Sequence, residues 1–600
     1  KTDGVPLFVE ELTKTVLESG LVRETDGSYV LASALTPLAI PSTLQDSLMA
    51  RLDRLASVRE VAQIGAAIGR EFSWRLLEAV APVQGSALQK ALDQLMASEM
   101  VYGHGVPPDA TYVFKHALVQ DTAYGSLLRG RRQRIHADIA RALTEGFADG
   151  NESVPAIVAH HYTEAGLPEP AVRAWLAAAE LALSRSAYAE ADRHIETGLV
   201  LIPNLPDGPD RQAIELALQL ARANALTPLK GYTAPETAAA LTAAKHLLDA
   251  GVGIDLQRFF VLYGLCEANY FAARLEEAFG LAQQIVEVAD RQDDTTCWLV
   301  GYRLLGTMQV LTGQHRQALE SLRQAEQYRD PGRQKALSYR FATDPGLAVL
   351  CYDIQASLFL GLFDRASRVS DAVRAELPSH GHATTVATCT FFALVWPELL
   401  QGDLEACERD SAELVAYCTE KRVEHWRLFS AICHACARAG REPTAENIAA
   451  FRAAIDAEHQ TGACISDSIF IGHLAQALLA SGDLSGAESV LQQGFAFVER
   501  SGELYWLAEM HRLDGLIELG RPAPDRTRAQ ACFLLAIEIA RQQAARLLEL
   551  RAATDLAKLW REAGWPHDPR PLLEPILAAI EGSKTTRDIG TARALLAELV

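Results

Sequence analysis

Glycines recur at a nearly constant interval through the second half of this 600-residue chain. The set comprises Gly313, Gly361, Gly402, Gly440, Gly482, Gly520 and Gly564. Successive members are separated by 48, 41, 38, 42, 38 and 44 residues. A period of this length is typical of stacked helix pairs, each with a tight turn between its two helices. The spacing predicts a mostly α protein with a long α-α superhelix over residues 206–585.

Small residues stand where the two helices of each pair are expected to cross. The clearest unit has Gly306, Ala318, Leu322 and Ala325 at the spacing of a tetratricopeptide repeat, with longer helices or loops than the standard repeat. Similar units are centred on residues 166–178, 191–203, 474–494 and 515–536. We therefore predict tetratricopeptide-like repeats, the first of them within residues 129–205. Pro397 falls inside a repeat helix and should distort it.

The composition of the chain limits the classes of partner that it can be expected to bind. A net charge of −20 disfavours DNA or an anionic membrane as the main partner. No stretch of 18 apolar residues lacks a charge, so we expect no membrane span. The ten cysteines are irregularly spaced, which suggests a reducing cytoplasm rather than a disulfide framework. These properties favour a cytoplasmic protein that binds other proteins or peptides.

The first 128 residues mix short helices with short strands. Asp26 and Gly27 lie between two apolar runs, which predicts a β-hairpin. From residue 40 onward, three helices precede two strands, at residues 100–102 and 111–114, which is the order of a winged-helix domain. Such a domain can read DNA or serve as a packing block. The supposed recognition helix at residues 87–99 has one lysine against one aspartate and one glutamate, so DNA reading is not expected.

Four short motifs together resemble one protein family. They are Gly4-Val5-Pro6 with the helix that follows, Ile40-Pro41-Ser42-Thr43-Leu44-Gln45, Ile68-Gly69-Arg70-Glu71-Phe72, and Phe114-Lys115-His116-Ala117-Leu118-Val119-Gln120-Asp121. The chain resembles, from Gly4 to its end, the bacterial STAND branch of the AAA-like signalling ATPases. Members carry a P-loop domain, a helical lid, a winged helix and helical repeats, and many are fused to a class III adenylate or guanylate cyclase domain.

The resemblance implies a division of the chain and a small set of nucleotide-binding residues. The implied parts are the end of the lid with the hairpin (1–39), the winged-helix-like domain (40–128), linker helices and first repeats (129–205), the repeat array (206–585) and a capping helix (586–600). Gly4 and Pro6 match the lid motif near the adenine, and His116 matches a histidine that senses the β-phosphate. Ala117 stands where related proteins have an aspartate after that histidine. The intact protein is expected to use ATP or ADP with Mg²⁺.

The sequence contains no catalytic motif of its own. No Gly-x-x-x-x-Gly-Lys-Ser/Thr loop is present to cradle phosphates, so we expect the P-loop to lie upstream of Lys1. We expect no cofactor and no metal in this chain, and read Cys433 and Cys436, and His160 and His161, as helix packing. The Arg-rich turn at residues 129–134 is either a contact for phosphate or an acidic partner, or a solvated turn.

Three functions remain open. The first is the regulatory half of a signalling ATPase, whose parent is an ATPase and possibly a nucleotide cyclase, with a partner in the repeat groove biasing the switch. The second is part of an ATPase-plus-repeats transcription regulator, which predicts a DNA-binding domain upstream. The third is a plain repeat scaffold for protein–protein interaction, which predicts no nucleotide response in the intact protein.

Overall fold

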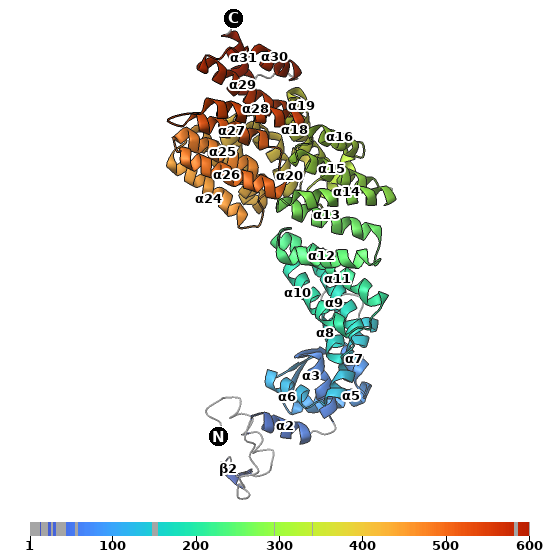
Figure 1. Ribbon diagram of the computed structural model, residues 1–600. Coiled ribbons are helices and arrows are strands. Elements are labelled where there is room, and N and C mark those ends of the chain that lie inside the picture. The colour runs from blue at the N-terminus through green and yellow to red at the C-terminus, as the bar shows by residue number, and fades with distance from the viewer. Residues whose placement is uncertain are drawn as a thin grey trace. The chain divides into compact units, whose positions relative to one another are not determined.

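The structure is a computed structural model of a mostly helical chain (Figure 1). It describes residues 13, 22–25, 28–31, 44–54, 58–146, 154–292, 294–338, 340, 341, 343–580 and 586–598. The chain divides into two compact units, residues 1–225 and residues 226–600.

Unit 1 begins with a hairpin and a small helix-and-strand block. Its elements are β1 (Val22–Thr25), β2 (Ser28–Leu31), α2 (Leu44–Arg54), α3 (Arg59–Ile68), β3 (Glu71–Ser73), α4 (Trp74–Val80), α5 (Gly85–Ala97), β4 (Val101–His104), β5 (Thr111–Phe114) and α6 (Ala117–Gly125). The predicted hairpin is confirmed: β1 and β2 pair antiparallel with Thr25 opposite Ser28. The two expected strands are present as β4 and β5, but the described residues place four helices, α2 to α5, before them rather than the predicted three.

A third strand completes the small sheet. The strand order is β3-β5-β4, and all pairs are antiparallel. The rings of Phe72, Tyr112 and Phe114 stack on one face of it and are buried. Ser73 ends β3 and caps α4 at once, because its hydroxyl accepts the Leu76 N–H at 3.2 Å. The sequence did not predict β3, because three residues between two helices show no alternating pattern.

Helix pairs follow in unit 1. They are α7 (Arg129–Gly146), α8 (Val154–Ala165), α9 (Pro168–Ser184), α10 (Tyr188–Leu201) and α11 (Pro209–Lys230), the last of which continues past Ala225. The apolar residues of unit 1 form two separate clusters, one around the sheet and α7, the other between α9, α10 and α11. Each helix pair therefore buries its apolar stripe against its neighbours.

Unit 2 consists of helices. They are α12 (Pro235–Asp249), α13 (Asp255–Phe271), α14 (Leu275–Gln292), α15 (Thr295–Leu311), α16 (His315–Glu326), α17 (Pro331–Leu337), α18 (Pro345–Phe359), α19 (Phe363–Glu376), α20 (Ala383–Thr390), α21 (Trp396–Gln401), α22 (Leu404–Lys421), α23 (Glu424–Arg441), α24 (Ala445–His459), α25 (Asp467–Ser481), α26 (Leu484–Ser501), α27 (Leu507–Leu519), α28 (Arg526–Gln542), α29 (Arg546–Ala563), α30 (Arg570–Ala579) and α31 (Arg587–Ala597). One continuous apolar core runs from Phe259 to Leu595.

The periodic glycines have two different roles. Five of them end a helix with positive φ: Gly313, Gly361, Gly402, Gly482 and Gly564. The prediction of a turn is wrong for Gly440, which lies inside α23, and Gly520 ends α27 without a positive φ. A Cβ at either position would approach a leucine of the preceding helix pair, Leu404 at 2.7 Å or Leu484 at 2.8 Å. These two glycines allow close helix packing rather than a left-handed turn.

The predicted small residues lie where helices cross. A Cβ on Gly306 would stand 2.7 Å from Leu322 Cγ, and one on Gly515 would stand 2.6 Å from the ring of Phe533. Ala318 and Ala325 are fully buried. The repeats therefore use the crossing geometry that the sequence predicts.

Pro397 lies in a distorted helix, as predicted. A π-helical segment, η4 (Phe391–Val395), joins α20 to α21, and Pro397 follows it. The wider turn accommodates a residue that has no N–H to donate. By length and composition, the continuous segment Ala383–Gln401 could cross a membrane, contrary to the sequence expectation, but 67% of it is buried inside unit 2.

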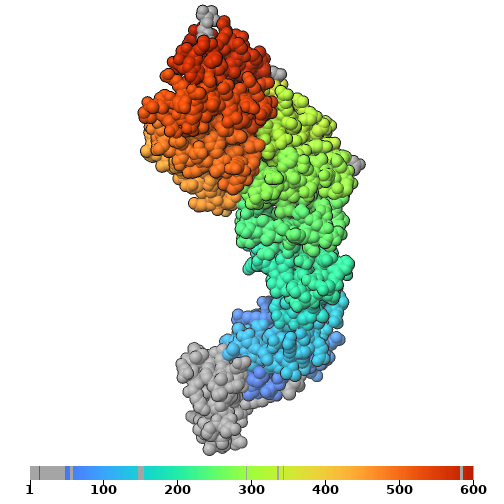
Figure 2. Space-filling view, viewed as in Figure 1, coloured from blue at the N-terminus to red at the C-terminus, as the bar shows by residue number. Residues whose placement is uncertain are grey.

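The first and second halves of unit 2 meet along a seam of backbone and side-chain contacts. The N–H groups of Leu504 and Tyr505 donate to the carbonyl oxygen of Leu311 at 2.9 and 3.1 Å, and Cys464 N–H donates to Phe271 O at 2.9 Å. Arg551 donates to Leu400 O at 2.5 Å. In Figure 2 the green and yellow residues of the first half border the orange residues of the second. The array is thus closed on itself within this unit.

Candidate functional site

His116 lies where the chain passes from β5 to α6. It is the residue that precedes α6, and its backbone is extended, with φ −133° and ψ 145°. Its side chain does not cap the helix, and Nε2 is buried without a hydrogen-bond partner among the described residues. Gly4 and Pro6, the other two predicted nucleotide-binding residues, lie outside the described residues.

The helix that begins after His116 is fixed to α3. Gln120 donates to the carbonyl oxygen of Ala66 at 3.2 Å, and Gln63 donates to the Ser126 hydroxyl at 2.7 Å. On the other side, Phe114 N–H donates to Arg70 O at 2.9 Å. His116 is therefore held between a sheet and a helix, so a ligand bound at its Nε2 would act on both.

The inner helices of unit 2 carry buried polar side chains. Arg303 on α15 donates to the Glu267 carboxylate on α13 at 3.0 Å, and both side chains are buried. The hydroxyl oxygens of Tyr270 and Tyr352 are 3.1 Å apart. Burial raises the pKa of the Tyr270 hydroxyl well above its ordinary value, so the tyrosines stay neutral.

A second buried network lies in the later repeats. Arg512 donates to Glu509 at 2.6 Å and to Asp555 at 2.5 Å, and Arg551 donates to Asp588 at 2.7 Å. Burial alone would raise the pKa of Glu509, but the guanidinium groups of Arg512 and Arg551 lower it to about 2. These charges compensate each other inside the fold, which is the requirement for burying them.

The polar interior around α18 is covered by other helices of unit 2. All 15 residues of α18 are buried, and α18 contacts α29 of the later repeats. A partner can therefore reach α18 only if the two halves of unit 2 separate. In the closed form, the exposed surfaces of the repeats are those of the outer helices and the turns.

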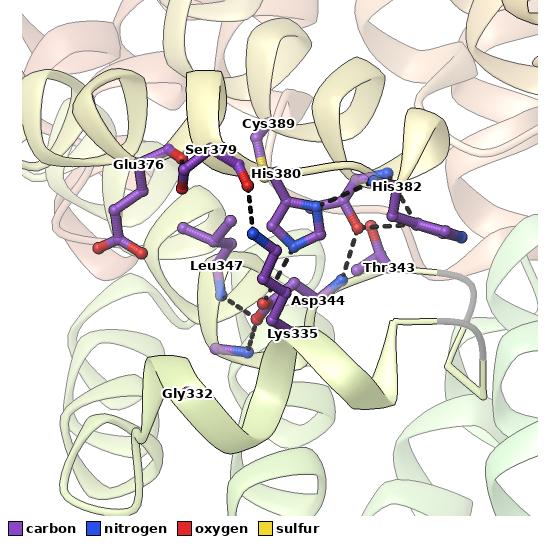
Figure 3. Close-up of polar contacts among 12 residues, drawn as sticks. Gly332, Lys335, Thr343, Asp344, Leu347, Glu376, Ser379, His380, His382 and Cys389 are labelled. Atoms are coloured by element: carbon purple, nitrogen blue, oxygen red, sulfur yellow. Dashed lines mark hydrogen bonds and ion pairs between the residues drawn. The ribbon is translucent and has the colours of Figure 1, made fainter.

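A buried histidine–aspartate pair links the start of α18 to the segment that precedes α20 (Figure 3). Asp344 caps α18 by accepting the N–H groups of Gly346 and Leu347 at 2.8 and 3.1 Å, and its other oxygen is 3.3 Å from His380 Nε2. His380 Nδ1 accepts the N–H of His382 at 3.3 Å. Because both ring nitrogens are engaged, His380 cannot take a proton from a nucleophile in this arrangement. We interpret the pair as a helix cap.

Of the residues read as helix packing from the sequence, Cys433, Cys436 and His161 are buried, whereas His160 is exposed, so the packing interpretation is wrong for His160. Cys433 and Cys436 lie inside α23, and burial raises the pKa of both thiols. His161 packs on His136, with their Nδ1 atoms 2.7 Å apart. All ten cysteines are free, and the described residues contain no group of three potential metal ligands.

Sequence reasoning missed a polar cleft in unit 1. It lies between α7 and α8, has a volume of about 410 Å³ and is lined by Arg129, Arg132, Gln133, Thr163, Glu164 and Gly166. The Arg-rich segment at residues 129–134, which forms the start of α7, was the sequence signal for this cleft. The residues of α8 that complete the cleft are about thirty positions away in the sequence. The sequence alone did not show which of the four arginines in residues 129–134 face a cleft.

Comparison with known proteins gives distant matches. No family profile matches the chain. An uncharacterized protein of Rhizobium meliloti (strain 1021) is 26% identical over 581 residues, which cover 93% of this chain and 53% of the relative. The chain thus spans about half the length of the curated relative it matches.

Similar solved structures are helical repeat proteins. One is a STAND protein with a tetratricopeptide repeat sensor from Pyrococcus horikoshii, with a TM-score of 0.40, 12% identity and coverage of 82% of this chain and 69% of that one. Another is a Rap protein complexed with Competence and Sporulation Factor, with a TM-score of 0.41, 10% identity and coverage of 66% and 98%. The helix pairs described above are tetratricopeptide-like, and the chain is a mostly helical repeat protein.

Proposed function

We propose that this chain is the regulatory and partner-binding part of a nucleotide-dependent signalling ATPase acting in the cytoplasm. An upstream P-loop domain of the parent protein binds ATP or ADP with Mg²⁺, and a class III cyclase domain is its output. Residues 40–128 act as a winged-helix block between that domain and the repeats. The repeats bind a protein or peptide that prefers one state of the switch and thereby shifts its population.

The observation that carries this proposal is the unpartnered Nε2 of His116. A buried imidazole nitrogen without a partner is costly, and a phosphate oxygen from an upstream domain would accept its hydrogen. The position joins β5 to α6, so loss of the phosphate would release the sheet and the helix together. Ala117 follows His116, so this histidine acts without the neighbouring aspartate of related proteins.

The test measures release of a fluorescent ADP analogue from the parent protein that includes the upstream segment. A hydrogen bond to a charged group contributes about 1.5–3 kcal/mol, so His116→Ala should speed release about tenfold to a hundredfold. His104→Ala is the matched control, because His104 is an exposed histidine on β4 of the same sheet. Equal release from both variants contradicts the role of His116, and failure of the parent to bind nucleotide favours a plain scaffold.

The partner is tested separately on the repeats. With a net charge of −20, the chain should prefer basic peptides over acidic ones of equal length. A peptide array probed with the 600-residue chain at low and physiological salt measures that preference. Capture of acidic peptides alone contradicts it.

A further inference from the structure

The cleft between α7 and α8 contains charges that the fold itself does not neutralise. Arg129 and Arg132 lie on its α7 side and Glu164 on its α8 side. No ion pair joins any of these three to another described residue. Their neighbours on α7 behave differently: Arg131 pairs with Glu60, and Arg134 donates to the carbonyl oxygen of Gly130 at 3.3 Å. Arg131 is therefore neutralised within the fold and Arg134 does not line the cleft, whereas Arg129 and Arg132 line it without an ion pair.

The guanidinium of Arg132 is partly fixed and partly unsatisfied. Its Cζ lies 4.5 Å from the centre of the Tyr124 ring, within the range of a cation–π contact. Its Nε is buried and has no acceptor among the described residues. A buried donor without an acceptor in the chain is satisfied by water or by a bound ligand. Because the ring orients the guanidinium, little side-chain entropy is lost when a ligand binds it.

The rest of the cleft leaves room for an anion. Gly166 has φ +71°, and a Cβ there would stand 3.0 Å from the amide nitrogen of Gln133. Two guanidinium groups against one carboxylate leave the cleft with a net positive charge. The Glu164 carboxylate, which accepts a long hydrogen bond from the Tyr124 hydroxyl at 3.5 Å, offsets only one of these two positive charges. Planar guanidinium groups match the two oxygens of a carboxylate or a phosphate.

A chain of hydrogen bonds leads from the cleft into the core. The Tyr124 hydroxyl is 2.9 Å from His136 Nε2, and His136 Nδ1 is 2.7 Å from His161 Nδ1. Burial lowers the pKa of His136 to about 4 and that of His161 to about 3, so both imidazoles are neutral at physiological pH. The exposed His160 and the charged Arg132 and Glu164 also face His136. The interior behind the cleft is therefore uncharged, so it supplies no buried acid that could pair with Arg129 or Arg132.

We propose that this cleft binds a small molecule through a phosphate or carboxylate group held by Arg129 and Arg132. Tyr124 lies in the last turn of α6, the helix that begins after His116. A ligand that engages Arg132 changes its contact with Tyr124 and so acts on α6. This regulatory consequence rests on the proposed function of His116, whereas binding itself does not.

The test is isothermal titration calorimetry on the 600-residue chain with inorganic phosphate and, separately, with succinate, in a low-salt buffer free of both. Binding of either anion is expected, and its Kd should rise at least tenfold in Arg132→Gln and in Arg129→Gln. Arg134→Gln is the matched control, since Arg134 is on the same helix but does not line the cleft. The preferred anion identifies the ligand as phosphorylated or as a carboxylic acid.

Two outcomes overturn the proposal. One is no heat with either anion at millimolar concentration. The other is binding that Arg132→Gln and Arg129→Gln leave unchanged, which places the anion elsewhere. Circular dichroism of each variant at the titration temperature checks that it is folded, and Arg132→Lys, which keeps the charge but loses the planar fork, should bind with intermediate affinity. Nucleotide plays no part in these titrations, so they can fail while the His116 experiment succeeds.

Discussion

In unit 1, two imidazoles are buried against each other and stay neutral, whereas unit 2 buries acids and bases in quantity. His136 and His161 resist protonation because burial lowers the pKa of each. In unit 2, Glu509 is ionised between two arginines, but burial raises the pKa of Glu458 to about 9 and that of Glu503 to about 7. The fold thus keeps a buried acid either by pairing it with arginine, as for Glu509, or by raising its pKa, as for Glu458 and Glu503, and each solution responds differently to mutation and to pH.

The paired acids should be the most sensitive to mutation. Arg512→Met leaves Glu509 and Asp555 without their main cation inside the core. We expect a loss of about 3–5 kcal/mol in the free energy of unfolding. Urea denaturation followed by tryptophan fluorescence measures it. Arg570→Met removes an exposed pair with Asp568 and should leave stability nearly unchanged, so similar losses in the two variants contradict this account.

The seam of unit 2 can be tested at a single glycine. Gly313 and Gly402 have nearly the same backbone, with φ +76° and +75°, but a Cβ on Gly313 would stand 2.7 Å from the Gln543 amide, and one on Gly402 would meet nothing within 4 Å. Gly402→Ala should cost about 1–2 kcal/mol for the left-handed backbone alone. Gly313→Ala should cost about 1 kcal/mol more, because it also displaces the Gln543 hydrogen bond to Leu504 O at 2.8 Å. Thermal unfolding of both variants compares them, and equal costs mean that the halves do not meet at Gly313.

The buried acids with raised pKa values determine how the stability of the fold changes with pH. Glu458 has an ordinary pKa of 4.5 and a folded pKa of about 9, so its contribution to stability is complete below pH 4.5 and is lost as pH rises through 9. The slope is about 1.4 kcal/mol for each pH unit in that window. Asp467 and His425 face Glu458. Of these two, only the Asp467 carboxylate raises the pKa of Glu458 further.

Glu458→Gln should flatten the fall in stability of α24 and α25 between pH 7 and 9. Hydrogen exchange of peptides from these helices measures the change, with correction for the intrinsic exchange rate. Peptides from α7 and α8 of unit 1 serve as the internal reference, because His136 and His161 lose their contribution only as pH falls below 6.5. A parallel pH response in both sets of peptides contradicts the assignment to Glu458.

Local features of the fold could be predicted from the sequence. The hairpin at Asp26 and Gly27, the positive φ at Gly313 and the close crossing at Gly306 each follow from a few neighbouring residues. Gly440 shows the limit of this reasoning, since a glycine is required there by the close approach of Leu404 on another helix. The regular spacing does not distinguish glycines that adopt a positive φ from glycines that allow close helix packing.

Features that depend on distant residues could not be predicted. Cys464 and Phe271 meet across 193 positions of sequence, and no periodicity indicates which turns of a repeat array will touch. The same holds for His136 and His161, which are too far apart to share a helix. Of the predicted nucleotide-binding residues, His116 is placed at a helix start by its local sequence, but its unsatisfied Nε2 depends on the packing around it.

The closure of unit 2 has a consequence for how the chain can be shortened and synthesised. An open solenoid loses its stability one repeat at a time, because each repeat touches only its neighbours. Here α15 and α18 are covered by helices near the C-terminal end, so deletion of α27 to α29 would expose apolar side chains in the early repeats. During translation the early repeats emerge first and remain uncovered until α29 has been made. Unit 2 should therefore complete its folding only after most of its length has left the ribosome.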